Sequence, residues 1–500
     1  VRSSAASDVY KRQIMKKLFY WILSSIVLFS CSETELLDNS IDDQLITTRA
    51  SGDGLYDVLG YGYDITKEYL HPMSVCNPVL DIEKYKQDYG ERLVTGTPSF
   101  GGDQMYYGYS AFDYLKDMTK ETKASLQVSD TAKQAAYSGS IAGGTYFKSA
   151  YSYSSKYSFA SIDAVRKLKY IRINDEKSRL MNYLSSSFKE DLNRLPAEKL
   201  VKRYGTHVLT NFTIGGRYKL LFRSVITNTT ENSVKRKTIA SGLKALVGDI
   251  GIGVNFDRNV ETSETLTREN KHRMLYVLFY GGTGTSLVYD LEKGLPTRID
   301  IQHWESTVNL TNANLTDINW EETYPIYEFI QDPQKRAEVK NAVDQYIAGQ
   351  QIKVLELRPM YRMHSKRQKN TFYVFTKSDA DYISKKWGDE SNGIDGYICV
   401  NPEPNTKPMY SLFSKRSENT FYVYDKAEVD YIVHKWGDTF YGLDGYMLTK
   451  PEDNTKPVYC LHSNRAKNTF FVFDKGEADR IVREFGDTYK GLVGYFYDAD

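Results

Sequence analysis

The stretch from Tyr204 to Gly216 constrains the fold more than any other part of the chain, because a helix must end and a strand must begin within it. The segment before it starts with Leu-Pro and carries apolar residues at helical spacing, which predicts a helix over 195–204. Gly205 suits the left-handed backbone that ends many helices. The β-branched residues after it lead to Gly215-Gly216, so they predict a strand that bends there.

Tyr204-Gly205-Thr206-His207, followed after a short strand by Gly215-Gly216, resembles the signature of the membrane attack complex/perforin (MACPF) superfamily. The resemblance covers about residues 51–355, and a MACPF domain is predicted over 51–356. It implies an α+β fold of the cholesterol-dependent-cytolysin type, in which two helical clusters flank a bent antiparallel sheet. No nucleophile stands at motif spacing from His207, so the signature residues are expected to be structural and the protein is not expected to be an enzyme.

The N-terminal region predicts export. Residues 1–14 look unrelated to the rest of the chain, and the natural start is predicted at Met15. Lys16 and Lys17 make a basic beginning, and Leu18–Phe29 is an apolar run too short to span a bilayer. This order is typical of a signal peptide.

The sequence Leu-Phe-Ser-Cys, which ends at Cys31, resembles a bacterial lipobox. It implies a lipoprotein signal peptide over 15–30, a lipid on the Cys31 sulfur, and a polar tether over 31–50. A plain signal peptide with an incidental cysteine is the alternative. Glu33 and Glu35 resemble the acidic export signals of Bacteroidota surface lipoproteins, which implies an outer-membrane lipoprotein that is exposed at the cell surface or released.

Two segments, one on each side of the signature, have the period of a β-strand. In the first, from Phe147 to Phe159, aromatic residues alternate with small and polar ones over about the length that a transmembrane strand needs, roughly 9–11 residues. The candidate membrane-inserting side chains here are Phe147, Tyr151, Tyr153, Tyr157 and Phe159.

The second segment lies within 228–270 and satisfies two periods at once. Apolar residues from Ile239 to Val254 form a helical stripe, yet those over 246–256 also share one face of a strand. A helix followed by a glycine-rich strand is one interpretation. The other is a switch, implied by the resemblance, from helices in the soluble protein to β-hairpins in a membrane. The candidate inserting residues are Leu246, Ile250, Ile252, Val254 and Phe256.

A threefold repeat with a period of 49 residues fills 357–500. The units span about 358–406, 407–455 and 456–500, and each predicts strand, turn, strand, helix, loop and strand. One unit is too small to bury its own apolar face, so the three are expected to pack around a pseudo-threefold axis in a β-rich domain.

Aromatic residues in the repeats have two expected roles. The aromatic residue that ends each predicted helix is expected to anchor the core, since it follows an isoleucine by four residues; these are Trp387, Trp436 and Phe485. The loop residues Tyr441 and Tyr489 are the candidates for binding a receptor or glycan, although the first unit has Asn392 at this position.

Composition narrows the class of function. The net charge of +1 offers no overall field for nucleic acid. The cysteines and the seven histidines form no metal pattern, and no cofactor is expected. The favoured hypothesis is a pore-forming surface or secreted toxin against competing bacteria, a monomer in solution and a ring of copies in a target membrane. The alternative is a non-lytic MACPF adhesin.

Overall fold

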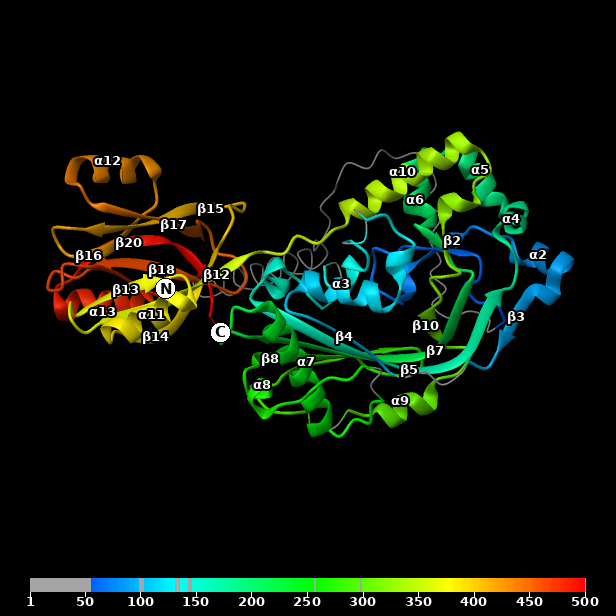
Figure 1. Cartoon of the computed structure of the whole chain (residues 1–500), viewed down its shortest axis with the longest axis horizontal. Coiled ribbons are helices and arrows are strands. Elements are labelled where there is room, and N and C mark those ends of the chain that lie inside the picture. Colours follow the sequence, from blue (N-terminus) through cyan, green and yellow to red (C-terminus); the bar gives the residue numbers. More distant parts are fainter. Residues whose placement is uncertain are drawn as a thin grey trace, which may run out of the picture. The chain divides into compact units, whose positions relative to one another are not determined.

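The computed structural model describes residues 55–98, 103–130, 133, 135–142, 146–255, 258–296 and 299–499. The predicted leader, signal peptide and tether, with Cys31, lie outside these residues, as does Phe256. The N-terminal domain is built on a seven-stranded antiparallel sheet in which two long strands pair along most of their length (Figure 1). The strands are β3 (Leu93–Gly96), β4 (Gln104–Gly108), β5 (Tyr157–Ile173), β7 (Asn211–Val225), β8 (Lys271–Tyr280), β9 (Leu287–Asp290) and β10 (Asn314–Ile318).

The glycine pair lies where β7 changes partners. Residues up to Gly215 pair with β10, and residues from Arg217 onward pair with β8. A side chain on Gly215 would stand 1.9 Å from the carbonyl oxygen of Arg166, and one on Gly216 would stand 2.7 Å from the Trp304 ring. β5 shifts its register opposite this pair, and Figure 1 shows that β5 and β7 are curved. The predicted bend therefore depends on two residues without a β-carbon.

A smaller four-stranded sheet carries the signature. Its strands are β1 (Tyr61–Tyr63), β2 (Val75–Pro78), β6 (His207–Val208) and β11 (Tyr324–Pro325). The helices of this part are α2 (Ile82–Tyr89), α4 (Lys177–Leu180), α5 (Ser186–Arg194), α6 (Ala197–Tyr204) and α10 (Pro333–Gly349). A further helix, α9 (Ile301–Thr307), packs through Trp304 in the apolar cluster of the large sheet that contains α7 residues. α6 confirms the helix predicted before the signature.

Two further helical segments cover opposite faces of the large sheet. α3 (Ala111–Glu121) follows β4, while α7 (Asn232–Asp249) and α8 (Glu264–Arg268) follow β7. Leu221 belongs to the apolar cluster that contains α3 residues, whereas its neighbours Leu220 and Phe222 belong to the cluster that contains α7 residues. Because alternate residues of a strand point to opposite faces, α3 and α7 lie on opposite sides of the sheet, as Figure 1 shows. This is the predicted bent antiparallel sheet between helical clusters.

The C-terminal domain is the predicted threefold repeat. Each unit contains a hairpin, a helix and a returning strand, and the last strands of all three units pair with one another. The side chains of Tyr373, Tyr422 and Phe471 meet at the axis, with ring centroids 5.2 to 5.9 Å apart. The elements are β12 (Leu357–Ser365), β13 (Asn370–Val374), α11 (Lys377–Trp387), β14 (Glu390–Cys399), β15 (Thr406–Ser414), β16 (Asn419–Val423), α12 (Lys426–Trp436), β17 (Thr439–Leu448), β18 (Thr455–His462), β19 (Thr469–Val472), α13 (Lys475–Phe485) and β20 (Thr488–Tyr497).

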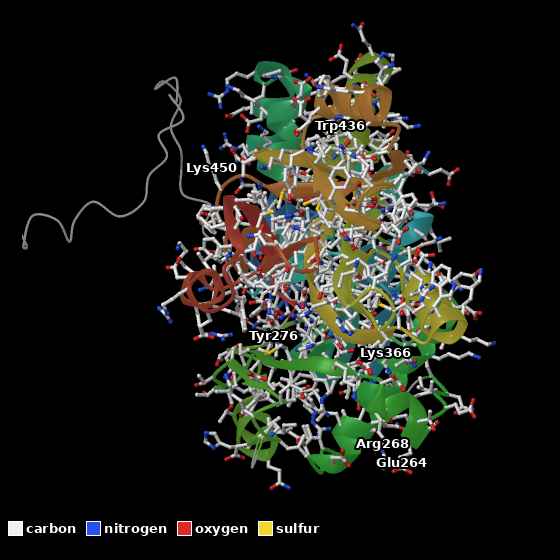
Figure 2. The ribbon with its side chains drawn as sticks, turned by 90° about the vertical axis from the view of Figure 1, so that its left-hand side faces the viewer. Glu264, Arg268, Tyr276, Lys366, Trp436 and Lys450 are labelled. Atoms are coloured by element: carbon white, nitrogen blue, oxygen red, sulfur yellow. The ribbon has the colours of Figure 1, made fainter. Side chains whose placement is uncertain are left out.

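The expectation that Trp387, Trp436 and Phe485 anchor the core is wrong. Their exposed fractions are 42%, 42% and 44%. Each helix packs through residues nearer its middle, such as Ala380 in α11. The ring at the helix end instead lies under an arginine, as in the contact between Arg416 and Trp436 at 4.4 Å. Figure 2 shows Trp436 on its helix. A spacing of four residues predicts a shared face but not how far the core extends along it.

Candidate functional site

The signature joins α6 to the small sheet through backbone that only glycine adopts easily. Gly205 has φ 76° and ψ −162°, so its φ is positive as predicted, but its ψ is extended rather than left-handed helical. A side chain there would stand 2.7 Å from the Tyr63 carbonyl. The Tyr204 hydroxyl donates a hydrogen bond of 2.8 Å to Asp191, which fixes the end of α6.

His207 is completely buried in β6, in the small sheet and not at the bend of the large one. Its Nε2 donates to the carbonyl oxygen of Gln127 at 3.2 Å, and its Nδ1 lies 2.9 Å from the hydroxyl of Thr206. Since a carbonyl can only accept, the proton is on Nε2. The ring also meets Trp320 edge-on at 5.4 Å. Through these contacts His207 joins β6 to two distant segments of the chain.

The free energy of unfolding is expected to depend on pH through His207. Burial lowers its pKa to about 4, whereas the unfolded residue titrates near 6.5. The unfolded state therefore binds the proton more readily, and His207 contributes stability above about pH 6.5 that is lost toward pH 4, about 3 kcal/mol in all. Urea unfolding at pH 7 and pH 4.5 should show a smaller loss for His207→Gln than for the wild-type protein. Equal losses would contradict this assignment.

A buried ion pair follows the glycine pair directly. Arg217 and Asp163 are 0% and 1% exposed, and Nη1 of Arg217 lies 3.0 Å from Oδ2 of Asp163. The guanidinium also donates to the Tyr69 carbonyl at 3.2 Å and stacks 4.1 Å from the centre of the Tyr280 ring, whose hydroxyl donates to Glu68. These contacts hold the N-terminal segment against β5, β7 and β8.

The first candidate segment is part of the connection between the neighbouring strands β4 and β5. The predicted strand over 147–156 is wrong, because 150–153 forms a 3-10 helix and β5 begins only at Tyr157. Phe147, Tyr151, Tyr157 and Phe159 are buried, and Tyr153 is partly buried. Phe147 meets Phe159 at 5.7 Å and Tyr276 at 5.3 Å, so its side of the segment faces the core of the domain rather than solvent.

The second segment connects the neighbouring strands β7 and β8. The segment is helical as far as Asp249, where α7 ends, as the helical period predicted. The strand predicted from the alternating period is not formed in this structure. Leu246 is buried, and Ile250, Ile252 and Val254 are partly buried against the same apolar cluster. Gly248 and Gly253 have no neighbouring atoms within reach of an added β-carbon.

Ionic contacts clamp this segment to α3 and β4. Asp117 is 3% exposed and accepts from Arg236 of α7 and from Arg258, the latter at 2.7 Å. Arg236 also reaches Asp113 at 2.6 Å. Both guanidinium groups stack on the ring of Tyr107, at 4.8 and 4.3 Å. We name this set the α3 clamp. No sequence pattern predicted the α3 clamp, because its acidic and basic residues are far apart in the chain and have no regular spacing.

In the repeats, the two receptor candidates are not equivalent residues. Leu412 in β15 pairs with Phe440, and Leu461 in β18 pairs with Tyr489, so Tyr489 corresponds to Phe440. Tyr441 corresponds to Asn392 and Lys490. Tyr441 and Tyr489 are both exposed, at 60% and 38%. The alignment of Tyr441 with Tyr489 is therefore wrong by one residue, and a one-residue slip places side chains on opposite faces of a strand.

No helix in the part of the chain that the structure describes is long and apolar enough to cross a membrane.

Comparisons with known proteins agree with this architecture. A family model described as MAC/Perforin domain matches residues 50–356, and one described as a domain of unknown function (DUF5648) matches 334–436 and 359–497. No curated protein sequence matches the chain. Among solved structures, the chain is similar to a putative cell invasion protein with a MAC/Perforin domain from Bacteroides thetaiotaomicron, with 17% identity over 72% of this chain and 71% of that one and a TM-score of 0.47.

It is also similar to GNIP1Aa from Chromobacterium piscinae, with 18% identity over 83% of this chain and 74% of that one and a TM-score of 0.45. The MAC/Perforin model covers more than half of the chain, the signature residues stand together at the junction of α6 and the sheets, and the bent antiparallel sheet lies between two helical clusters. The protein is a member of the MAC/Perforin family.

Proposed function

We propose that the protein forms pores by converting its two helical insertions into membrane-spanning β-hairpins. The observation that carries this proposal is topological. One insertion joins β4 to β5 and the other joins β7 to β8, and each pair consists of strands in one antiparallel sheet. Extending these strands along their existing direction would convert each insertion into a hairpin. Pairing between hairpins of neighbouring copies would satisfy the backbone groups that lipid cannot.

The wider setting is part of the same proposal. A lipid on Cys31 would hold the protein at the outer membrane, with the protein exposed to the exterior or released. The C-terminal repeats would recognise a receptor or glycan on a competing bacterium, and a soluble monomer would assemble into a ring on that target membrane. The exposed aromatic residues Tyr441 and Tyr489 support recognition by the repeats.

A non-lytic adhesin is the second candidate, and the α3 clamp favours it. Several charges hold the second insertion to α3, and separating them opposes release. Dye release distinguishes the two functions. A pore-forming protein releases dye from liposomes made of target-cell lipids or from target cells. A protein that binds cells and releases no dye from any membrane is an adhesin.

Release of the second insertion is expected to limit the rate of leakage. Asp117→Asn removes the charge that pairs with Arg236 and Arg258, and should weaken docking by about 2–3 kcal/mol after allowance for the partly exposed arginines. If release limits the rate, leakage becomes roughly 30- to 160-fold faster. The measurement is the initial rate of dye release at a fixed protein concentration.

The matched control breaks an exposed ion pair in the same insertion. Glu264 and Arg268 lie one turn apart on α8, with more than three quarters of each side chain exposed (Figure 2). Exposed pairs contribute little, so Glu264→Gln should leave the rate within about twofold. Unchanged leakage in Asp117→Asn would show that the clamp does not limit release.

A further inference from the structure

Clefts lie at the seams between neighbouring repeats in the C-terminal domain. The cleft between the first and second repeats has a volume of about 500 Å³, and the cleft between the third and first has a volume of about 540 Å³. Both are in the size range of small-molecule sites. The corresponding part of each repeat contributes to its cleft, as Arg367 and Asp389 do in one and Arg465 and Asp487 do in the other.

Of these two clefts, the one between the first and second repeats has exposed aromatic rings in its lining. Trp387 of the first repeat is 42% exposed, and Tyr441 of the second is 60% exposed. Phe413, which also lines the cleft, lies next to Tyr441, with 6.1 Å between the ring centroids. Side chains with an apolar ring and a polar edge suit ligands that are partly apolar and partly hydrated.

The same cleft holds two carboxylates that lack a hydrogen-bond donor on one oxygen. The side chain of Asp389 is 2% exposed, its Oδ2 lies 3.6 Å from Arg367, and its Oδ1 has no hydrogen-bond partner. Asp444 accepts from the Ser411 hydroxyl at 3.1 Å through Oδ1, while its Oδ2 has none. Burial raises the pKa of Asp444 to about 7. A buried carboxylate oxygen without a hydrogen bond lowers the stability of the folded protein, so a ligand that donates a hydrogen bond to it would be favoured.

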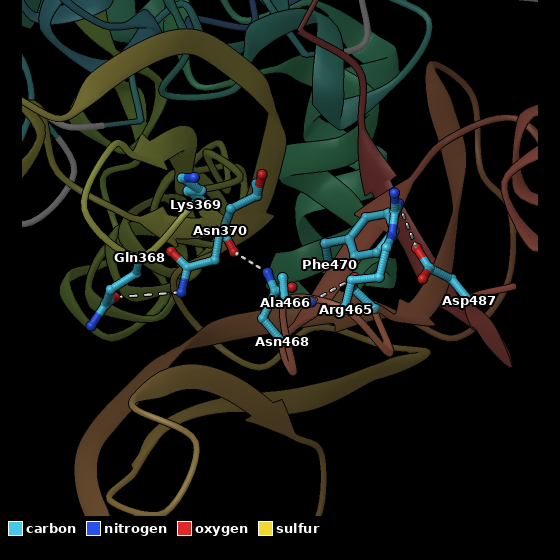
Figure 3. A pocket seen from close by; sticks show the side chains of 10 residues that line it. Gln368, Lys369, Asn370, Arg465, Ala466, Asn468, Phe470 and Asp487 are labelled. Atoms are coloured by element: carbon cyan, nitrogen blue, oxygen red, sulfur yellow. Dashed lines mark hydrogen bonds and ion pairs between the residues drawn. The ribbon is translucent and has the colours of Figure 1, made fainter. Parts of the chain in front are cut away.

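The equivalent positions of the other repeats differ in residue type or in hydrogen-bond partners. The Asp389 equivalents Asp438 and Asp487 each accept a main-chain N–H, at 3.3 and 3.2 Å. Figure 3 shows Asp487 beside Arg465 in the cleft between the third and first repeats. The Asp444 equivalent in the first repeat is Asp395, whose Oδ1 pairs with Arg362 at 2.7 Å while its Oδ2 has no hydrogen-bond partner. In the third repeat it is Val493. The seam between the first and second repeats therefore combines the two exposed aromatic rings with Asp389 and Asp444, each of which has one unpaired carboxylate oxygen.

The lining charges select against a strongly charged ligand. The lining contains two basic side chains, Arg358 and Arg367, and three acidic ones, Asp379, Asp389 and Asp444. Its positive and negative charges therefore nearly cancel. The carboxylate oxygens require hydrogen-bond donors, and the rings offer an apolar face. A sugar ring meets both needs, because its hydroxyl groups donate hydrogen bonds and its C–H face is apolar.

We propose that the cleft between the first and second repeats binds one neutral sugar ring of a surface glycan. The proposal rests on the proposed role of the repeats in recognising a cell surface. It places the binding at one site rather than at three equivalent sites. Trp387 and Tyr441 form its aromatic walls, and Asp389 and Asp444 accept from sugar hydroxyls.

The test is ¹⁹F NMR of the full chain labelled with 5-fluorotryptophan. The probes are glucose, galactose, mannose, fucose and N-acetylglucosamine, with N-acetyl-lysine amide and acetate as charged comparisons. Trp387→Phe assigns the Trp387 signal, and the signals of buried Trp304 and Trp320 report an intact fold. At least one neutral sugar should shift the Trp387 signal and leave that of Trp436 unchanged.

Two substitutions copy the sister repeats, so the fold already accommodates their side chains. Asp444→Val introduces the residue of the third repeat and Tyr441→Asn that of the first. Each should weaken sugar binding by at least ~10-fold. Trp436→Phe, which copies Phe485, should bind as the wild-type protein does. No shift of Trp387 with any sugar, equal binding by Asp444→Val, or a response to the lysine probe alone would overturn the proposal.

A separate assay isolates this site from pore formation. Dye release from liposomes that carry no glycan should be the same for the wild-type protein and for Asp444→Val. If the wild-type protein releases no dye from any membrane but still binds a sugar at Trp387, the pore proposal fails and the sugar site stands.

Discussion

A disulfide between Asp103→Cys and Asn255→Cys is expected to abolish pore formation. The main-chain N–H of Asp103 donates to the carbonyl of Asn255 at 2.8 Å, and the N–H of Asn255 donates to the Asp103 side chain at 2.9 Å. Residues joined in this way have Cα atoms within the range that a disulfide spans. The bridge ties the second insertion to the start of β4, so the insertion cannot move away to become a hairpin. Dye release from liposomes is the measurement.

The same preparation supplies its own control. Reduction should restore leakage to the rate of the unbridged protein, and each single-cysteine variant should leak with or without reductant. Cys76, Cys399 and Cys460 are buried, so they should not compete for the bridge. Full leakage from completely oxidised protein would show that residues 240–256 do not insert.

Arg217→Met is expected to lower the free energy of unfolding by about 3–5 kcal/mol, because it leaves the carboxylate of Asp163 buried without its ionic partner. The substitution also removes the donor to the Tyr69 carbonyl and the stacking on Tyr280. Urea unfolding of the purified full chain measures the effect.

The double variant separates charge from packing. Arg217→Met combined with Asp163→Leu removes both charges and should recover a large part of the loss, since a buried ion pair is often replaceable by apolar residues of similar size. A matched surface variant, Lys123→Met, breaks the exposed pair with Glu321 and should change stability by less than about 1 kcal/mol. A loss below about 1 kcal/mol for Arg217→Met would contradict the structural importance of the pair.

Local signals predicted much of the fold. The helix before Gly205 and the glycine pair in β7 follow from propensity and backbone freedom within a few residues. The helix that begins at Pro333 is capped by Asp332, whose side chain accepts from the N–H of Lys335 at 2.6 Å. The repeat period predicted the order of elements in each unit. All of these depend on neighbours along the chain.

The spacing of apolar residues did not predict the secondary structure correctly where one pattern is compatible with two kinds of structure. Alternation from Phe147 to Phe159 predicted a strand, but aromatic residues with small neighbours also suit the compact 3-10 turn that packs Phe147 against Tyr276. From Leu246 the helical and strand periods coincide, and packing of α7 on the sheet selects the helix in this state. The non-equivalence of Tyr441 and Tyr489 is different in kind, because the repeat period of 49 residues already matches Tyr489 to Phe440 and the strand pairing agrees with it.

The sequence by itself determined the family, the bend at Gly215-Gly216 and the threefold repeat, because each rests on residue types at short, regular spacing. Only the tertiary structure decided which charged side chains form ion pairs and which face of each insertion is buried. It also decided which seam brings together Asp389 and Asp444, each with one carboxylate oxygen that lacks a hydrogen bond. Arg217 with Asp163, the α3 clamp and the pair Asp389 and Asp444 join residues from separate elements. Such contacts are set by the packing of whole sheets and helices, and no local pattern records them.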